Sequence, residues 1–168
     1  MSINYLDTLL NSMANRLQQR FLSSPHEELL MIGIHTGGVW VAERLHTLLN
    51  LSKPLGQLNI AFYRDDFTRV GLHPRVTPST LPFKIENRHI ILVDDVLHTG
   101  RTIRAALNEI FDYGRPAGIT LAVLIERNGR ELPIQADVVG CSLCLAKHKH
   151  IKLCGPTPLH LEVRTVHD

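Results

Sequence analysis

The sequence predicts an α/β fold in which a doubly wound, mostly parallel sheet carries helices on both faces. Apolar runs of strand length alternate along the chain with segments whose apolar residues recur at helical spacing. The strand runs at residues 28–34, 89–93 and 118–126 are apolar almost throughout, which is typical of strands buried on both faces. Alternating strands and helices of this kind form parallel sheets, and ligands bind beyond the carboxyl ends of their strands.

The individual elements follow in order along the chain. Residues 6–17 place apolar side chains on one helical face and are expected to form a covering helix. Two strand-loop-helix units come next, with helices at 41–49 and 103–111 whose inward faces include Leu48 and Phe111. The remaining predicted elements are strands at 28–34, 57–63, 89–93, 118–126 and 137–141, a proline-containing functional loop at 64–83, a helix end at Gly114, and an edge strand at 159–166.

Length and composition fit one globular domain. The chain has 168 residues, 20% of them charged, and a net charge of +2, which neither demands nor excludes a nucleic-acid partner. No apolar run approaches the about 18 residues of a membrane span, and the first residues lack the continuous apolar core of a signal peptide. We therefore expect a cytoplasmic protein without a membrane partner, formed by a single domain over residues 1–168.

The segment at residues 89–107 contains the polar groups that best suit a ligand-binding site. Two adjacent carboxylates, Asp94 and Asp95, follow the predicted strand at 89–93, and the polar run 98–102 leads into the next helix. Backbone N–H groups and the positive dipole end at a helix start attract an anion, and carboxylates accept hydrogen bonds from hydroxyls or bind a divalent metal. Together the two groups suit a sugar phosphate such as ribose 5-phosphate.

This segment also has a simpler explanation as a set of turn and helix caps. A lone Asp or Thr usually only caps a turn or a helix, but here several features coincide. The chain lacks the GKS or GKT of a Walker A loop and the GxGxxG of a dinucleotide fold. A phosphate site of another kind is therefore the better interpretation.

Residues 91–102, ILVDDVLHTGRT, resemble the phosphoribosyl-pyrophosphate (PRPP) motif of the type I phosphoribosyltransferases. The similarity extends over residues 33–45, 58–67 and 111–140, which is most of the chain. Within that family, the segments YRDD, GRP and RELPI resemble the pyrimidine-operon regulators that also have uracil phosphoribosyltransferase activity. The resemblance implies the type I phosphoribosyltransferase fold with a small hood.

The resemblance also implies roles for individual residues. The implied catalytic residues are Asp94, Asp95 and Arg64, of which the two aspartates contact the ribose hydroxyls. The implied binding residues are His98, Thr99, Gly100, Arg101 and Thr102 for the 5-phosphate of PRPP, His35, Thr36, Gly37 and Gly38 for pyrophosphate, Arg64, Asp65 and Asp66 in the flexible loop, and Val138 and Val139 for the base.

The implied reaction is displacement of pyrophosphate from PRPP by uracil, which gives UMP. Mg²⁺ is the implied cofactor, held mainly through PRPP and also by Asp94 or Asp95. The implied partners are PRPP, uracil and UMP, together with the leader RNA of pyrimidine genes, and we expect a homo-oligomer. Two alternatives stay open: a regulatory RNA-binding nucleotide sensor with little catalysis, and a phosphoribosyltransferase for another base such as a purine.

One departure from the family pattern concerns the pyrophosphate loop. Many of the regulators read Thr-Arg-Gly where this chain has Thr36, Gly37 and Gly38, so a cation near pyrophosphate is missing. Backbone donors still bind an anion there, and weaker PRPP binding is expected rather than loss. On this interpretation, Gly37→Arg should tighten PRPP binding.

The sequence contains two further clusters, one of cysteines and histidines and one of basic residues. Cys141 and Cys144, with His148, His150 and Cys154 after them, have spacing that resembles zinc ligands, but a single C-x-x-C favours incidental thiols. The basic segment, defined as residues 147–152, could meet RNA phosphates, although a charge run is more often a solvated face.

Overall fold

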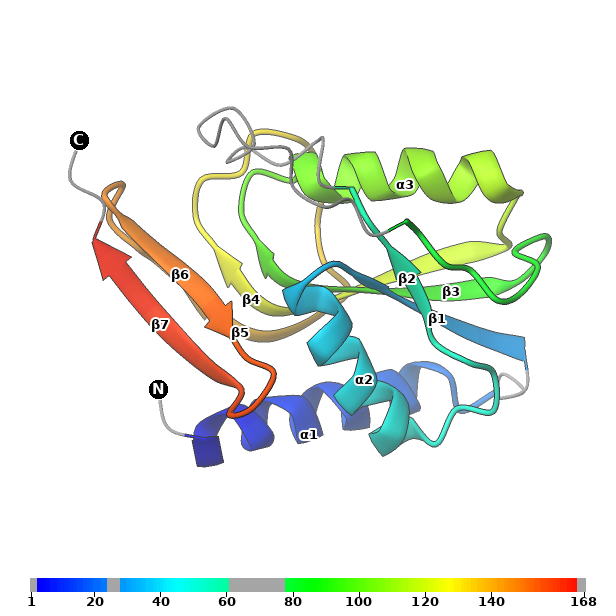
Figure 1. Ribbon diagram of the computed structural model, residues 1–168, viewed down its shortest axis with the longest axis horizontal. Coiled ribbons are helices and arrows are strands. Elements are labelled where there is room, and N and C mark those ends of the chain that lie inside the picture. The colour runs from blue at the N-terminus through cyan, green and yellow to red at the C-terminus, as the bar shows by residue number, and fades with distance from the viewer. Residues whose placement is uncertain (1–2, 24–27, 61–77, 166–168) are drawn as a thin grey trace.

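We describe a computed structural model of the chain, which covers residues 3–23, 28–60 and 78–165. Five parallel strands form one sheet in the order β2-β1-β3-β4-β5, and two antiparallel strands form a separate hairpin (Figure 1). In chain order, the elements are α1 (Ile3–Arg20), β1 (Leu29–Ile34), α2 (Gly37–Leu49), β2 (Gly56–Leu58), β3 (His89–Leu97), α3 (Arg101–Tyr113), β4 (Gly118–Arg127), β5 (Val138–Leu143), β6 (Lys149–Cys154) and β7 (His160–Thr165). The predicted doubly wound α/β class is confirmed.

Helices cover both faces of the sheet. Helix α3 lies on one face, and α1 and α2 lie on the other (Figure 1). The hairpin of β6 and β7 lies beside the carboxyl ends of β3 and β4, and β6 contacts β3 (Figure 1). This hairpin corresponds to the small hood that the family resemblance implies. Within the three described ranges, no helix is both long and apolar enough to span a membrane.

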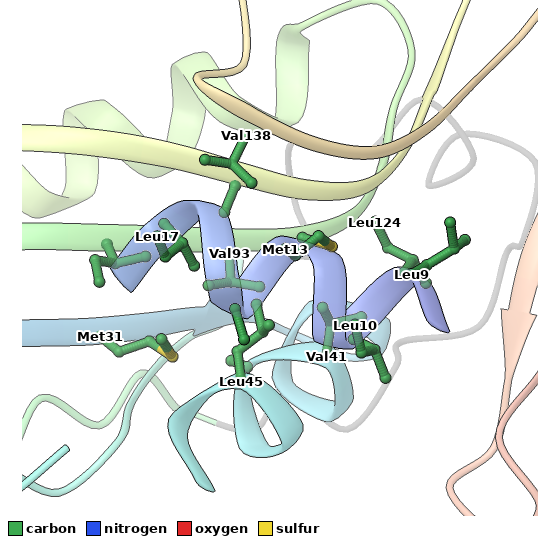
Figure 2. Packing of buried hydrophobic residues seen from close by; sticks show 14 of the residues in the cluster. Leu9, Leu10, Met13, Leu17, Met31, Val41, Leu45, Val93, Leu124 and Val138 are labelled. Carbon is green, nitrogen blue, oxygen red and sulfur yellow. The ribbon is translucent and has the colours of Figure 1, made fainter. Parts of the chain in front are cut away.

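The predicted covering helix packs as expected. Every fourth or third residue of α1 is apolar, and Leu10, Met13 and Leu17 are at most 2% exposed. Figure 2 shows these side chains meeting residues of α2 and of the sheet, among them Leu45 and Val93. The apolar side of the amphipathic helix α1 covers the part of this sheet face that α2 leaves uncovered.

Some sequence predictions differ from the structure. Leu48 and Phe111 were expected to face inward, but they are 48% and 57% exposed. Each lies at the margin of its helix's buried stripe, which runs through Leu45 and Leu49 in α2 and through Ile103, Ala106 and Ile110 in α3. The predicted strand at 57–63 is represented in the described residues by the shorter β2.

The end of β3 also differs from its prediction. Asp94 and Asp95 were expected just after a strand at 89–93, but β3 continues to Leu97 and contains both. The reason is the neighbouring strand, because β4 stays in register alongside, with Asp94 opposite Val123 and Leu97 opposite Glu126. The carboxylates are therefore held by the sheet itself.

Candidate active site

The two carboxylates lie at the carboxyl end of β3 and have different environments. Asp94 is 1% exposed, whereas Asp95 is partly exposed. Asp94 Oδ1 accepts the backbone N–H of Asp95 at 2.9 Å, and Asp95 Oδ1 accepts that of Val96 at 2.9 Å. These bonds fix the orientation of both side chains, and Asp95 remains the more accessible of the two.

The predicted pyrophosphate loop packs directly against these carboxylates. Strands β1 and β3 are parallel neighbours, with Gly33 opposite Val93. The loop that follows β1 therefore lies at the same edge of the sheet as Asp94 and Asp95. A Cβ added to Gly37 would lie 2.6 Å from Asp95 Cγ and closer still to Oδ2, and one added to Gly38 would lie 3.0 Å from Asp94 Oδ1. The predicted pyrophosphate loop and the two carboxylates therefore meet, and their separation leaves no room for a side chain at Gly37 or Gly38.

This contact corrects the expectation for Gly37→Arg. The sequence interpretation counted only the added cation, but any side chain at position 37 must first displace the Asp95 carboxylate. His35 and Thr36 precede the glycines at the same edge, and Thr36 is exposed. The His35 N–H donates to the carbonyl of Leu58 at 2.8 Å, which ties the loop to β2.

The predicted phosphate loop, His98 to Thr102, leads from β3 into α3. Gly100 is the N-cap of α3 and has φ 93°, in the left-handed region that favours glycine. Thr99 Oγ1 accepts the N–H of Arg101, the first residue of α3, at 3.2 Å. The N-cap residue itself, Gly100, makes no side-chain capping bond. The helix start therefore offers backbone donors and a positive dipole end to an anion.

A segment after β4 holds this loop in place, which the sequence interpretation missed. The N–H groups of Glu131 and Leu132 donate to the carbonyl of Thr99 at 2.9 and 3.1 Å. The guanidinium of Arg130 donates through Nη1 to the carbonyl of His98. The RELPI segment, which carries part of the family resemblance, therefore also supports the loop through its backbone and its arginine.

Ion pairs reinforce that support. Arg130 Nη2 lies 2.7 Å from Glu126 Oε1, and both side chains are about three-quarters buried, with 25% and 28% exposure. Arg101 Nε lies 2.8 Å from Glu131 Oε2 in a more exposed pair. The Arg130–Glu126 pair is the more buried of the two, so solvent and salt screen its attraction less and it contributes more to holding the loop.

Two buried polar atoms near this edge have no hydrogen-bond partner among the described residues. One is Nε2 of His35 in the glycine loop, and the other is Nε of Arg127 at the end of β4. Arg127 is 6% exposed and donates from Nη1 to the carbonyl of Lys149 at 2.9 Å, which joins β4 to the hairpin. Burial lowers the pKa of Arg127.

The predicted base-binding residues, Val138 and Val139, lie at the start of β5. Val138 is 3% exposed and packs against α1 (Figure 2), and Val139 packs against the core cluster on the opposite face of the sheet. The Val139 carbonyl already accepts Arg16 Nη1 at 2.8 Å. Strand β4 separates both residues from Asp94 and Asp95, so neither side chain is brought to the carboxylates. Arg64, Asp65 and Asp66 lie outside the described residues.

The comparisons with known proteins bear on this geometry. The family model for the phosphoribosyl transferase domain matches residues 4–159. The bifunctional protein PyrR of Nitrosococcus oceani is 62% identical over 163 residues, which cover 96% of this chain and 92% of that protein. The chain belongs to the PyrR family. A second PyrR, from Pseudomonas paraeruginosa, is 57% identical and covers 92% of this chain and 91% of its own length.

Solved structures agree with this PyrR-family assignment at the level of the fold. A hypoxanthine-guanine phosphoribosyltransferase of Bacillus anthracis has a TM-score of 0.68 at 17% identity, with 85% of this chain and 82% of that chain covered. The hypoxanthine phosphoribosyltransferase of Trypanosoma cruzi has a TM-score of 0.70 at 21% identity, with 88% and 78% covered. The predicted phosphoribosyltransferase fold is therefore confirmed.

Proposed function

We propose that this PyrR-family protein transfers the phosphoribosyl group of PRPP to uracil, giving UMP and pyrophosphate, and regulates pyrimidine biosynthesis genes in response to uridine nucleotides. The observation that carries the proposal is the packing of the glycine loop against Asp94 and Asp95, beside the N-terminus of α3. Carboxylates between two anion-binding loops suit a ribose with a phosphate group at each end. The whole chain, residues 1–168, acts as one cytoplasmic domain.

Each part of PRPP has a matching group in this arrangement. Asp95, with Asp94 behind it, accepts hydrogen bonds from the ribose hydroxyls, and the loop from His98 to Thr102 holds the 5-phosphate. The loop from His35 to Gly38 holds pyrophosphate through backbone donors. Catalysis then rests on positioning and charge neutralisation, and no covalent nucleophile is needed.

The residues present fit a Mg²⁺ ion bound mainly through PRPP. Both Oδ1 atoms accept backbone N–H groups, and Asp94 is almost fully buried, so Asp95 Oδ2 is the carboxylate oxygen best placed for a metal. Mg²⁺ favours one or two carboxylates together with substrate phosphates and supplies charge neutralisation at the leaving pyrophosphate. Asp95 would orient the ion.

The direct test is UMP synthesis from uracil and PRPP with Mg²⁺, measured beside the same assay with hypoxanthine and with guanine. UMP formation that exceeds purine nucleotide formation supports the proposal. Preference for a purine assigns the same site to another base. Turnover with none of the three bases, with PRPP or UMP still bound, favours the nucleotide-sensing regulator.

The regulatory half of the proposal rests on the basic segment. Its three lysines are exposed: two lie in β6, where Ile151 and Leu153 are buried, and one precedes the strand. Those lysines are Lys147, Lys149 and Lys152. Clustered cations bind RNA phosphates, and a homo-oligomer would multiply the surface.

The regulatory test is a titration with the leader transcript of the organism's own pyrimidine genes, with and without UMP. Binding should strengthen with UMP, because a ligand shifts an equilibrium only by preferring one state. RNA should tighten UMP binding by the same factor. Binding no better than that of unrelated RNA of equal length would remove the regulatory half and leave an enzyme.

A further inference from the structure

Three side chains with metal-binding atoms meet on the outer face of the β6–β7 hairpin. Cys154 is the cross-strand partner of His160, and Glu162 lies two residues further along β7, on the same face. One ligand atom from each of the three residues lies within 4.8 Å of the other two. The inner face, with Ile151, Leu153 and Leu161, belongs to the core, so the backbone beneath this cluster is anchored.

The imidazole of His160 is oriented as a metal ligand would be. Its Nδ1 lies 3.0 Å from the carbonyl oxygen of Pro158, which can only accept, so Nδ1 carries the hydrogen. Its Nε2 lies 3.0 Å from Glu162 Oε1, another acceptor when ionised. A neutral ring cannot donate to both groups, so Nε2 requires either a proton or a cation between it and the carboxylate. Metal-bound histidines commonly donate their second N–H to a backbone carbonyl.

The charges around Glu162 leave one of its oxygens for that cation. Arg164 binds Oε2 through Nε at 3.0 Å and Nη2 at 2.7 Å, while Oε1 faces His160. The Arg164 guanidinium, 2.7 Å from Oε2, favours the ionised form of the Glu162 carboxylate.

We propose that Cys154 Sγ, His160 Nε2 and Glu162 Oε1 bind a zinc ion. Thiolate, imidazole and carboxylate are the ligand types of zinc, and three protein ligands leave a fourth tetrahedral position for water. A thiolate ligand disfavours Mg²⁺, which separates this site from any ion bound with PRPP. On binding, the Cys154 thiol proton and any proton on His160 Nε2 are released to solvent.

The expected consequence is a clamp on the hood. Cys154 and His160 stand on either side of the turn at residues 155–159, so an ion held between them joins the two strands where the hairpin turns. Arg164 keeps its bond to Oε2, and its Nη2 also lies 4.0 Å from Cys154 Sγ, so it contacts two of the three proposed ligands. This inference uses residues outside the proposed active site and does not depend on the proposed function.

The test uses the full chain, freed of metal by a chelator and titrated with Co²⁺ under reducing conditions. Cobalt bound by a thiolate in four-coordinate geometry gives a sulfur-to-metal charge-transfer band and intense visible bands. We expect both to saturate at one equivalent and to disappear when Zn²⁺ is added. Cys154→Ser should abolish the charge-transfer band, and His160→Gln and Glu162→Gln should each weaken Co²⁺ binding at least about tenfold.

The matched control is Cys144→Ser, because Cys144 is an exposed free thiol outside this cluster. It should bind Co²⁺ like the parent protein. Urea unfolding of each variant without metal checks the fold, and Glu162→Gln serves as the near-isosteric variant if Cys154→Ser is unstable. The proposal is overturned if the parent shows no charge-transfer band, if Cys154→Ser retains it, or if Cys144→Ser loses it.

Discussion

Gly37→Ala is the smallest change that probes the contact between the glycine loop and the carboxylates. The added Cβ would lie 2.6 Å from Asp95 Cγ and 3.0 Å from Asp95 Cβ. Because separations below 3 Å force a displacement, the Asp95 side chain must turn away from the position in which its Oδ1 accepts the Val96 N–H. PRPP would then meet a misplaced carboxylate.

The magnitude follows from this crowding. Adding a methyl group to a well-packed site typically costs about 1–3 kcal/mol. If this penalty falls on the binding-competent arrangement, PRPP affinity drops about 5- to 150-fold, since about 1.4 kcal/mol corresponds to a factor of ten. Gly37→Arg should also weaken PRPP binding, because a partly exposed ion pair with pyrophosphate stabilises the complex by only about 0.2–1 kcal/mol, which is less than the crowding penalty.

The assay is calorimetric titration of PRPP with Mg²⁺ and without uracil. Gly118→Ala is the matched control, since its Cβ would also crowd a side chain, that of His89, at the opposite end of the sheet. A double-mutant cycle with Asp95→Ala isolates the contact, because Gly37→Ala should add little once the carboxylate is gone. The reasoning is refuted if Gly37→Ala binds PRPP like the parent, or if its effect is the same in both backgrounds.

Replacing Asp94 and Asp95 together by asparagine should abolish UMP synthesis with little change in the urea midpoint, since each amide oxygen still accepts the following N–H; near-normal synthesis would disprove their ribose role. Alanine at the three lysines of the basic segment should reduce the salt slope of RNA binding by about 2, and an unchanged slope would place the RNA elsewhere. Burial, and secondarily the charge of Arg20, lowers the pKa of His89 below 6.5, so its stabilising contribution is present above pH 6.5 and is lost as pH falls towards the folded-state value. The unfolding free energy should therefore fall more between about pH 7.5 and about pH 5 in the parent than in His89→Gln, and equal losses would exclude His89 as the titrating group.

Local patterns in the sequence were sufficient for much of the fold. The apolar runs of β1, β3 and β4 and the stripe of α1 report burial directly, because side-chain periodicity follows from backbone geometry. Element ends were less predictable. Asp94 and Asp95 belong to β3 because β4 continues beside them. The sequence around a polar residue does not reveal whether a neighbouring strand extends alongside it.

The fold class, the PRPP motif and the likeness to the pyrimidine-operon regulators could all be recognised from the sequence, because each depends on residues close together in the chain. Contacts between residues far apart in the chain depend on the folded structure. It placed Asp95 where a side chain on Gly37 would go, and so reversed the expected effect of an arginine there. It also separated Cys154 from the C-x-x-C pair and joined it to His160 and Glu162, since antiparallel pairing of β6 with β7 sets that contact and spacing along the chain does not.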